Sequence, residues 1–309
     1  MLGSLNMDIS VTVPRLPAPG ATVLGGAAAF SPGGKGANQA VAAARLGAAV
    51  RMVGCVGDDE FGRSLRAALE AEAVGDDGVR TVPGVPTGLA MITVDEAGEN
   101  IITVAPGANR EVGEAEIAAI GDVAADVLVI SAEVPVAAIR AALATRQALR
   151  VLNLAPAPPE AAELVAAGVD WLVVNEPEAA AVLGRPVAGL AGAARAAADL
   201  AKAGTRNAVV TAGAAGAAYR GSRDDAGGPD GVLTVPGFQV HAVDTVGAGD
   251  TFVGALAAAL AAGVPPRDAV RAAAAAGAAA ATRPGTQAGM PRPADVLAAT
   301  GHTWPVPAR

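Results

Sequence analysis

The sequence predicts an α/β fold in which helices cover both faces of a mostly parallel central sheet. From about residue 35, short continuous apolar runs alternate with alanine-rich segments of helical length. Apolar strands separated by helices are typical of a parallel sheet that is buried on both faces. Two segments, residues 9–30 and 87–104, interrupt this alternation and predict a small additional β unit.

The individual elements follow in chain order. Small residues over 36–46 predict a helix, and a strand follows at 50–54. Later apolar runs predict strands at 127–130, 151–154, 171–174 and 208–210, and the segments between them predict helices at 139–147, 160–167 and 191–203. The apolar stretch 252–282 is interrupted by Pro265, Pro266 and nearby charges, so it predicts two packed helices and no membrane span.

The two interrupting segments are rich in Val, Thr and Ile, contain Pro and Gly, and alternate roughly with period two. They predict short antiparallel strands, too few to be stable without packing on a larger unit. We therefore expect residues 1–309 to form one α/β domain with a small discontinuous β lid from about 9–30 and 87–104.

The composition excludes several classes of protein. Asp and Glu outnumber Lys and Arg by 30 to 22, the formal net charge is -8, and aromatic residues make up 2% of the chain. A nucleic-acid surface needs basic stripes and stacking rings, so no nucleic-acid partner is expected. The single cysteine, Cys55, excludes an intramolecular disulfide and fits a reducing compartment. No signal peptide is visible, and we expect a cytoplasmic protein.

Residues 244–252 carry the strongest chemical signal. An expected strand at 239–243 leads into Asp-Thr-Val-Gly-Ala-Gly-Asp, which ends at Asp250, and then into an alanine-rich helix. Glycines at a helix N-terminus turn backbone N–H groups toward an anion such as phosphate. A carboxylate would repel that anion, which makes sense if Asp250 is a general base for an attacking hydroxyl. The alternative is that Asp250 only caps the helix.

Two other stretches suit a polar ligand. Glycines flank Lys35 at an expected helix start, and Asn38 follows about one turn later on the same side. The chain has only one other lysine, which favours a function for Lys35 over a solvated turn. Near the N-terminus, Asn6 and Asp8 point to one side of an extended segment and suit a polyol, although such residues are also ordinary in loops.

Polar residues also follow the expected strands. Four of these strands lead into or contain a polar residue near the end, namely Glu133, Asn153, Asn175 and Thr211. Ligands of open α/β sheets bind outside the carboxyl ends of the strands. Any one of these residues is better explained as the start of a loop, but four together indicate a site.

Together these stretches resemble the ribokinase branch of the PfkB carbohydrate-kinase family, over essentially the whole chain. Six motifs occur in the family's order, at residues 3–8, 33–40, 54–62, 153–157, 175–178 and 244–250. The resemblance implies a ribokinase-like three-layer sandwich and ATP-dependent phosphorylation of the 5-hydroxyl of D-ribose. It also implies Mg²⁺ as a cofactor and activation by a monovalent cation such as K⁺.

The resemblance also implies a role for each matching position. Asp250 would be the general base, beside an anion hole of backbone amides from Gly247, Ala248 and Gly249. The sugar would be bound by Asn6, Asp8, Gly34, Lys35, Asn38 and Glu133. The nucleotide would lie against Asn175, Thr211, Gly213 and Gly216, with Glu178 acting indirectly on Mg²⁺. The monovalent cation would be held by Asp244 and by backbone oxygens of Val246, Ala280, Arg283 and Gly285.

Three features depart from the family pattern. Ala274 stands where Asn or His is usual near the nucleotide, and Gly289 stands where a serine often supports the cation site. Only Met1 and Leu2 precede Gly3, where relatives have a longer central strand. These departures predict altered nucleotide affinity and ion dependence, and a shortened first strand with reduced stability. In relatives the lid pairs with a second lid, which predicts a homodimer.

Two alternatives stay open at this point. One is another PfkB kinase, such as a deoxyribokinase, a nucleoside kinase or a fructokinase. The other is a non-catalytic sugar-binding protein on the same fold, which is less favoured because Asp250 and the glycine turn are both intact.

Overall fold

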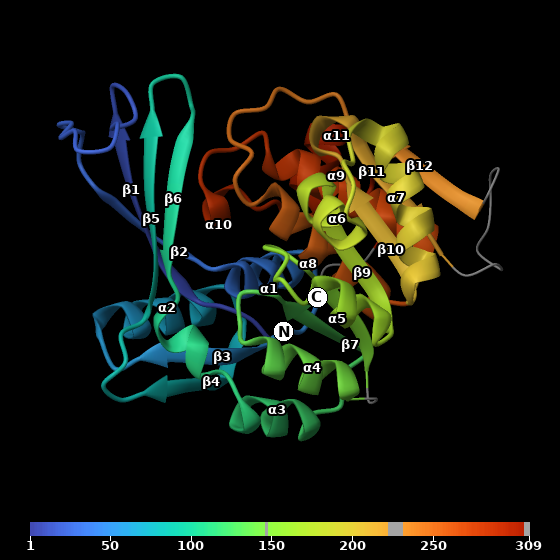
Figure 1. The fold of residues 1–309 in the computed structure, drawn as a ribbon, viewed down its shortest axis with the longest axis horizontal. Coiled ribbons are helices and arrows are strands. Elements are labelled where there is room, and N and C mark those ends of the chain that lie inside the picture. The colour runs from blue at the N-terminus through green and yellow to red at the C-terminus, as the bar shows by residue number, and fades with distance from the viewer. Residues whose placement is uncertain (146–147, 222–230, 306–309) are drawn as a thin grey trace.

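The computed structural model describes residues 1–145, 148–221 and 231–305, and it confirms the α/β fold class (Figure 1). A six-stranded sheet runs in the order β12-β11-β10-β9-β8-β7. Strands β7 to β10 are parallel, whereas β11 and β12 extend one edge in antiparallel pairs. The strands are β7 Val127–Ser131, β8 Leu149–Asn153, β9 Val169–Asn175, β10 Thr205–Thr211, β11 Gly216–Arg220 and β12 Val232–Pro236.

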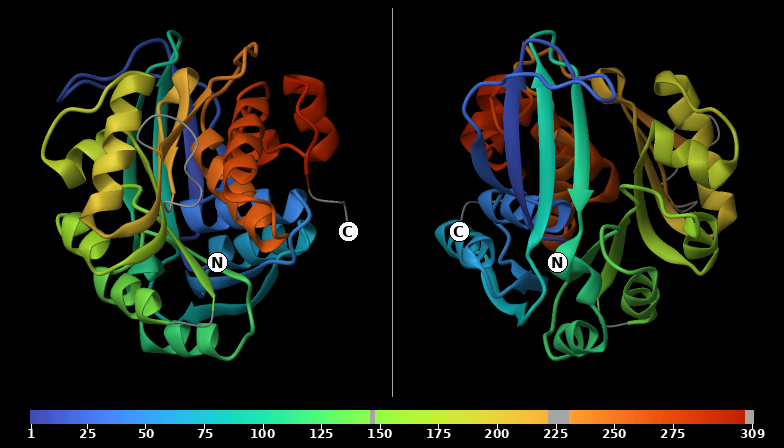
Figure 2. Two further views of the ribbon diagram at one scale, coloured as in Figure 1. Left: turned by 90° about the vertical axis from the view of Figure 1, so that its right-hand side faces the viewer. Right: turned by 60° about the vertical axis from the view of Figure 1, so that its left-hand side comes forward.

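Helices cover both faces of this sheet because successive side chains of a strand point to opposite faces. Leu128 and Ile130 of β7 pack with helices α4 to α7 on one face. Val129 of β7 and Val151 of β8 pack with α8 and α9 on the other face, and Figure 2 shows both layers. The two helices predicted within 252–282 are confirmed, and none of the described helices is long and apolar enough to cross a membrane.

The helices have the following bounds: α1 Lys35–Arg45, α2 Glu60–Ala71, α3 Glu114–Gly121, α4 Val136–Ala144, α5 Ala161–Ala166, α6 Glu176–Leu183, α7 Gly189–Ala203, α8 Ala248–Ala261, α9 Pro266–Ala280, α10 Thr286–Gly289 and α11 Pro293–Thr300. Short 3-10 helices lie at Gly107–Glu111 and Gly213–Ala215.

Met1 and Leu2 join the six-stranded sheet to a second, two-stranded parallel sheet. The N–H of Leu2 donates to the carbonyl oxygen of Val129 at 2.8 Å, and the N–H of Ser131 donates back to that of Leu2 at 2.9 Å. On the other side, the N–H of Val53 donates to the carbonyl oxygen of Met1 at 2.7 Å. Leu2 pairs with Val53 and with Ile130 through isolated bridges. The second sheet contains β3 Arg51–Gly57 and β4 Gly75–Val82.

The two interrupting segments form a separate four-stranded sheet, which stands to one side of the six-stranded sheet and its helices (Figure 1). Pairs β1–β2 and β5–β6 are antiparallel as predicted. The central pair, β1–β5, is parallel, so the prediction of antiparallel strands alone was wrong. These two strands come from distant parts of the chain, and no hairpin forces them to run in opposite directions. The strands are β1 Asn6–Val13, β2 Ala29–Gly33, β5 Gly88–Asp95 and β6 Asn100–Ala105.

The predicted strand at residues 239–243 was also wrong, because these residues have no regular secondary structure. The N–H groups of Val243 and Asp244 instead donate to the carbonyl oxygen of Ala281, at 2.8 and 3.2 Å. The chain therefore reaches α8 through a loop that is fastened to the end of α9.

Candidate active site

Asp250 lies in the first turn of α8, directly after the glycine turn. The capping residue is Gly247, with a φ of 79° that suits glycine, and no side chain caps this helix. The alternative that Asp250 is only a cap is therefore wrong. Ala248 donates its N–H to the carbonyl oxygen of Thr245 at 3.2 Å, whereas within the described residues the N–H groups of Gly249 and Asp250 have no acceptor. These free amides are available to an anion.

Each carboxylate oxygen of Asp250 accepts a hydrogen bond from a side-chain amide of α1. Asn38 Nδ2 donates to Oδ2 at 2.9 Å, and Gln39 Nε2 donates to Oδ1 at 3.0 Å. Gln39 also donates to Asn153 Oδ1 at 2.9 Å, and Gln287 Nε2 donates to Asn38 Oδ1 at 3.0 Å. Asn38 was predicted from the sequence, whereas Gln39 and Gln287 were not. The position of Gln39 directly after Asn38 in the glycine-rich motif was the signal that could have found it.

A second polar group surrounds Glu133, shortly after β7. Ser4 Oγ donates to Glu133 Oε2 at 2.6 Å, and the backbone N–H of Lys35 donates to the same oxygen at 3.2 Å. Asn109 Nδ2 donates to Asn6 Oδ1 at 2.8 Å. Ser4 and Asn109 are buried and were not predicted. Both bind predicted residues and fix the orientation of those side chains.

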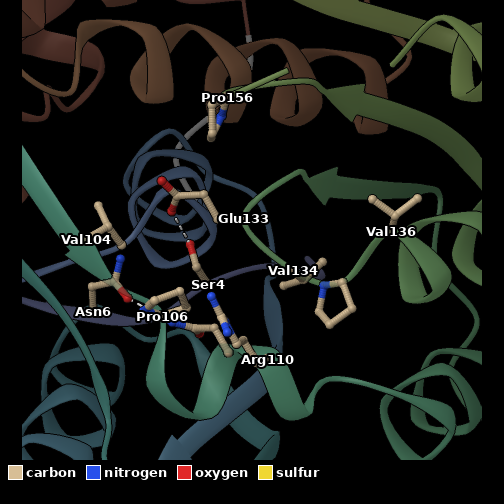
Figure 3. A pocket seen from close by; sticks show the side chains of 11 residues that line it. Ser4, Asn6, Val104, Pro106, Arg110, Glu133, Val134, Val136 and Pro156 are labelled. Carbon is tan, nitrogen blue, oxygen red and sulfur yellow. Dashed lines mark hydrogen bonds between the residues drawn. The ribbon is translucent and has the colours of Figure 1, made fainter. Parts of the chain in front are cut away.

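A cavity of about 580 Å³ opens beside this group (Figure 3). Asn6, Glu133 and Ser4 line it together with Val104 of β6, so the four-stranded sheet contributes to its wall. This volume is ordinary for a small-molecule site. Of the predicted sugar-binding residues, only Asn6 and Glu133 line the cavity. Arg110 also lines it and was not predicted.

Lys35 interacts electrostatically with the carboxylates of the site. Asp250 raises the pKa of Lys35 most, burial lowers it, and Glu133, Glu178 and Asp8 raise it further. The ammonium group therefore lies within electrostatic reach of four carboxylates. Asp8 is buried on β1, and burial raises its pKa to about 7, with smaller increases from Glu133 and Asp250 and a decrease from Lys35.

Asn175 and Glu178 lie at the junction of β9 and α6. Asn175 Oδ1 accepts from the N–H of Glu178, and a carboxylate oxygen of Glu178 accepts from the N–H of Asn175, both at 2.9 Å. This reciprocal pair is a capping box, so both residues have a structural role whatever they bind. Burial raises the pKa of Glu178, against decreases from the Asn175 N–H and from Lys35.

Three other predicted residues lie near the same end of the sheet. Thr211 ends β10 and is paired with Asn175 in the register of β10 with β9. A Cβ placed on Gly213 would meet nothing within 4 Å, so this residue borders open space. A Cβ on Gly216 would lie 2.0 Å from the carbonyl oxygen of Val235, so Gly216 is required by the close approach of β11 to β12.

Gly34 is also explained by packing. Its φ is 87°, and a Cβ there would lie 2.7 Å from the backbone nitrogen of Asn6. A glycine at this position lets the start of α1 approach the strand that carries Asn6 and Asp8.

Asp244 fastens the loop before α8 to the loop before α10. Its Oδ1 accepts from the N–H of Val246 and its Oδ2 from the N–H of Gly285, both at 2.9 Å. The described residues contain no group of three or more His, Cys, Asp or Glu that could hold a metal ion. The predicted cation ligands here are the Asp244 carboxylate and backbone oxygens.

Such oxygens converge beside Gly289. A Cβ placed on Gly289 would lie 3.0 Å from the carbonyl oxygen of Arg283 and 3.5 Å from those of Ala280 and Pro284. Clustered carbonyl oxygens can replace the hydration shell of a monovalent cation. Two of these oxygens, those of Ala280 and Arg283, belong to the predicted cation ligands.

The whole chain is similar to known carbohydrate kinases. Residues 1–293 match the model of the pfkB family carbohydrate kinase. The ribokinase of Schizosaccharomyces pombe is 37% identical over 94% of each chain, and that of Haemophilus influenzae is 35% identical over 98% of each. A deoxyribokinase of Salmonella typhi is 35% identical over 83% of each chain.

Solved structures agree with the sequence comparison. The ribokinase of Thermotoga maritima matches with a TM-score of 0.83 and 31% identity, over 96% of this chain and 97% of that chain. Arabidopsis thaliana ribokinase complexed with ribose and ATP matches with a TM-score of 0.81 and 28% identity, over 96% of each chain. The chain therefore belongs to the pfkB family of carbohydrate kinases.

Proposed function

We propose that this carbohydrate kinase is a ribokinase, which transfers the γ-phosphoryl group of ATP to the 5-hydroxyl of D-ribose. The observation that carries the proposal is the placement of Asp250. Two side-chain amides of α1 donate hydrogen bonds to its carboxylate. The first turn of α8, which carries Asp250, also carries the free N–H groups of Gly249 and Asp250. A base and an anion hole side by side are what in-line phosphoryl transfer requires.

Asp250 acts as the general base in this mechanism. The ribose 5-hydroxyl oxygen attacks the γ-phosphorus while its proton passes to the carboxylate. The bond from the γ-phosphorus to the bridging oxygen breaks, and ADP leaves with that electron pair. The free N–H groups of Gly249 and Asp250, in the predicted anion hole and directly after it, face the negative charge on the transferred group, whereas the N–H of Ala248 is engaged by Thr245; Gly249 leaves open space there because it has no side chain.

The sugar binds on the side of Asn6 and Glu133. Both side chains line the cavity and are pre-oriented by Asn109 and Ser4, so little conformational entropy is lost when ribose binds. Asp8, Lys35 and Asn38 complete this side, and Gly34 contributes its backbone. The charge of Lys35 offsets the repulsion among the surrounding carboxylates.

The nucleotide lies against Asn175, Thr211, Gly213 and Gly216, at the carboxyl ends of β9 and β10 and the start of β11, whereas the sugar lies beside the end of β7. Glu178 would act on Mg²⁺ indirectly, with one of its carboxylate oxygens fixed by the N–H of Asn175. Mg²⁺ neutralises charge on the phosphates when it is bound.

A monovalent cation such as K⁺ would be held beside the anion hole by Asp244 and by backbone oxygens of Val246, Ala280, Arg283 and Gly285. The convergence of carbonyl oxygens at Gly289 supports this assignment. When bound, the cation adds positive charge near the 247–249 turn without touching substrate.

The four-stranded sheet acts as a lid over the sugar and pairs two subunits in a homodimer. One face of it exposes Phe30, Met91 and Ile101, which a second copy would cover. The single cysteine is buried, and a cytoplasmic location is part of the proposal.

An ATP-consumption assay across D-ribose, deoxyribose, fructose and nucleosides tests the substrate assignment. D-Ribose should give the highest kcat/KM. The second candidate is a deoxyribokinase, because the Salmonella typhi enzyme is about as similar as the ribokinases. A higher kcat/KM for deoxyribose would select it, and no ATP consumption with any sugar would contradict both.

A further inference from the structure

Gln39 is a buried residue that contacts the proposed base without lining the cavity. Its Nε2 donates one hydrogen bond to Asp250 Oδ1 at 3.0 Å and another to Asn153 Oδ1 at 2.9 Å. Asn153 ends β8, and its Nδ2 donates to the carbonyl oxygen of Val173 on β9 at 3.1 Å. Two side-chain amides thus connect the carboxylate of Asp250 to the backbone of the central sheet.

These contacts determine the orientation of the Gln39 amide. Both partner atoms are acceptors, so only Nε2 can face them. The opposite atom, Oε1, is buried and has no partner among the described residues. An unpaired buried oxygen lowers stability, and an apolar side chain of the same length would avoid that cost. The contacts of Gln39 therefore do more than fill space.

The other oxygen of Asp250 is held differently. Asn38 Nδ2 donates to Oδ2, and Asn38 belongs to the proposed sugar-binding residues. A sugar hydroxyl that engages Asn38 and Asp250 must replace or share this contact. Gln39 has no exposed surface, so its bond to Oδ1 persists when the sugar enters.

We propose that Gln39, supported by Asn153, is a positioning residue that holds the carboxylate plane of Asp250 during sugar binding and reaction. With Oδ1 held by Gln39, Oδ2 is the atom that accepts the proton of the attacking hydroxyl. This inference rests on the proposed role of Asp250 as the general base.

Gln39→Met and a matched control test the proposal. Methionine keeps the length of the side chain and removes both donors. It should lower kcat for ribose by about 10- to 100-fold, because displacing a reacting group by about 1 Å has an effect of this size. The KM for ribose should not change. The control is Val41→Ala. Val41 lies on the same helix and is as buried as Gln39, but it packs among apolar residues. The control should lower the melting temperature without changing kcat.

Gln39→Glu gives a readout that a purely structural role would not move. The introduced carboxyl can donate to Asp250 only when it is protonated, and burial beside a carboxylate favours the protonated form. Its kcat relative to the unmodified enzyme should therefore rise as the pH falls. A ratio that does not change with pH would overturn the proposal.

Combining Gln39→Met with Asp250→Asn distinguishes a failure of the positioning role from a failure of the proposed function. Residues that act as a unit are not additive, so adding Gln39→Met to Asp250→Asn should cause no further loss of kcat. Normal turnover of Asp250→Asn would contradict the proposed function itself. A slow Asp250→Asn together with a normal Gln39→Met would overturn only the positioning role.

Discussion

The proposed sugar side and nucleotide side of the site differ in the chemical groups that line them. The sugar side consists of buried or partly buried charged and amide side chains that hold one another, such as Ser4 on Glu133 and Asn109 on Asn6. The proposed nucleotide side consists of the helix cap formed by Asn175 and Glu178, of Thr211 at the end of β10, and of a glycine beside open space at Gly213. We infer that discrimination between sugars depends on single side-chain atoms, whereas nucleotide binding depends more on backbone shape.

Glu133→Gln should therefore weaken the binding of ribose strongly and leave the binding of MgATP unchanged. It removes a charged acceptor that is already positioned by Ser4 and the Lys35 amide. We expect the KM for ribose to rise by about 10- to 100-fold, the range for loss of a hydrogen bond to a charged group, while the KM for MgATP stays unchanged. Steady-state kinetics with each substrate varied in turn measures both.

Glu114→Gln is the matched control, because Glu114 is exposed on α3 and does not line the cavity. It should behave as the unmodified enzyme. An equal rise in both KM values for Glu133→Gln would contradict the separation of the two sides.

The pH dependence of ribose binding should show the next largest effect. The pKa of Asp8 is about 7, so its carboxylate is mostly ionised at pH 8 and mostly protonated at pH 6. If the ionised form accepts from sugar hydroxyls, the KM for ribose should rise about tenfold between pH 8 and pH 6. Asp8→Asn should have a high KM at both pH values, and the same slope in this variant would contradict the assignment.

The same carboxyl should link function to stability with a definite sign. Its pKa is raised from 3.8 to about 7 by burial, so the fold favours the protonated form. The protonated Asp8 carboxyl therefore contributes to the free energy of unfolding. This contribution is fully present below about pH 4 and is lost as the pH rises through about 7. Asp8→Asn should thus be more stable than the unmodified chain at pH 8, by at most about 4 kcal/mol. Denaturant unfolding at pH 4 and pH 8 checks this, and no gain at pH 8 would contradict it.

The cation prediction has the smallest expected effect. The oxygens near Gly289 are backbone atoms, and the cation would act only through charge beside the 247–249 turn. We expect kcat to be several-fold higher in K⁺ buffer than in a buffer of a bulky organic cation, with the KM for ribose unchanged. Equal rates in the two buffers would show that this loop does not bind an activating cation.

Local patterns predicted the parts of the molecule that depend on local chemistry. The strands β7 to β10 were predictable because each is a continuous apolar run, and the family and fold class are confirmed. The roles of Asp250, Asn38 and Asp8 stay predictions, although the structure places these residues near one another.

The missed features depend on contacts between distant residues. The Asn109 side chain binds Asn6 across 103 positions, and Gln39 binds Asp250 across 211. Gly254 shows the same limit, because a Cβ there would lie 2.5 Å from the Gln39 carbonyl oxygen, a fit between α1 and α8 that no local pattern reveals. The strand wrongly predicted at 239–243 failed for a related reason, since a β pattern forms a strand only where a neighbour pairs with it.

The central claim is that Asp250 is a base and not a sugar-binding group alone. Asp250→Asn tests it most directly, with kcat from an ATP-consumption assay and ribose affinity from calorimetry on the same preparation. We expect a loss of kcat of about 10²- to 10⁴-fold, the range for removal of a general base, with ribose binding retained. Near-normal turnover in this variant would show that Asp250 is not the base.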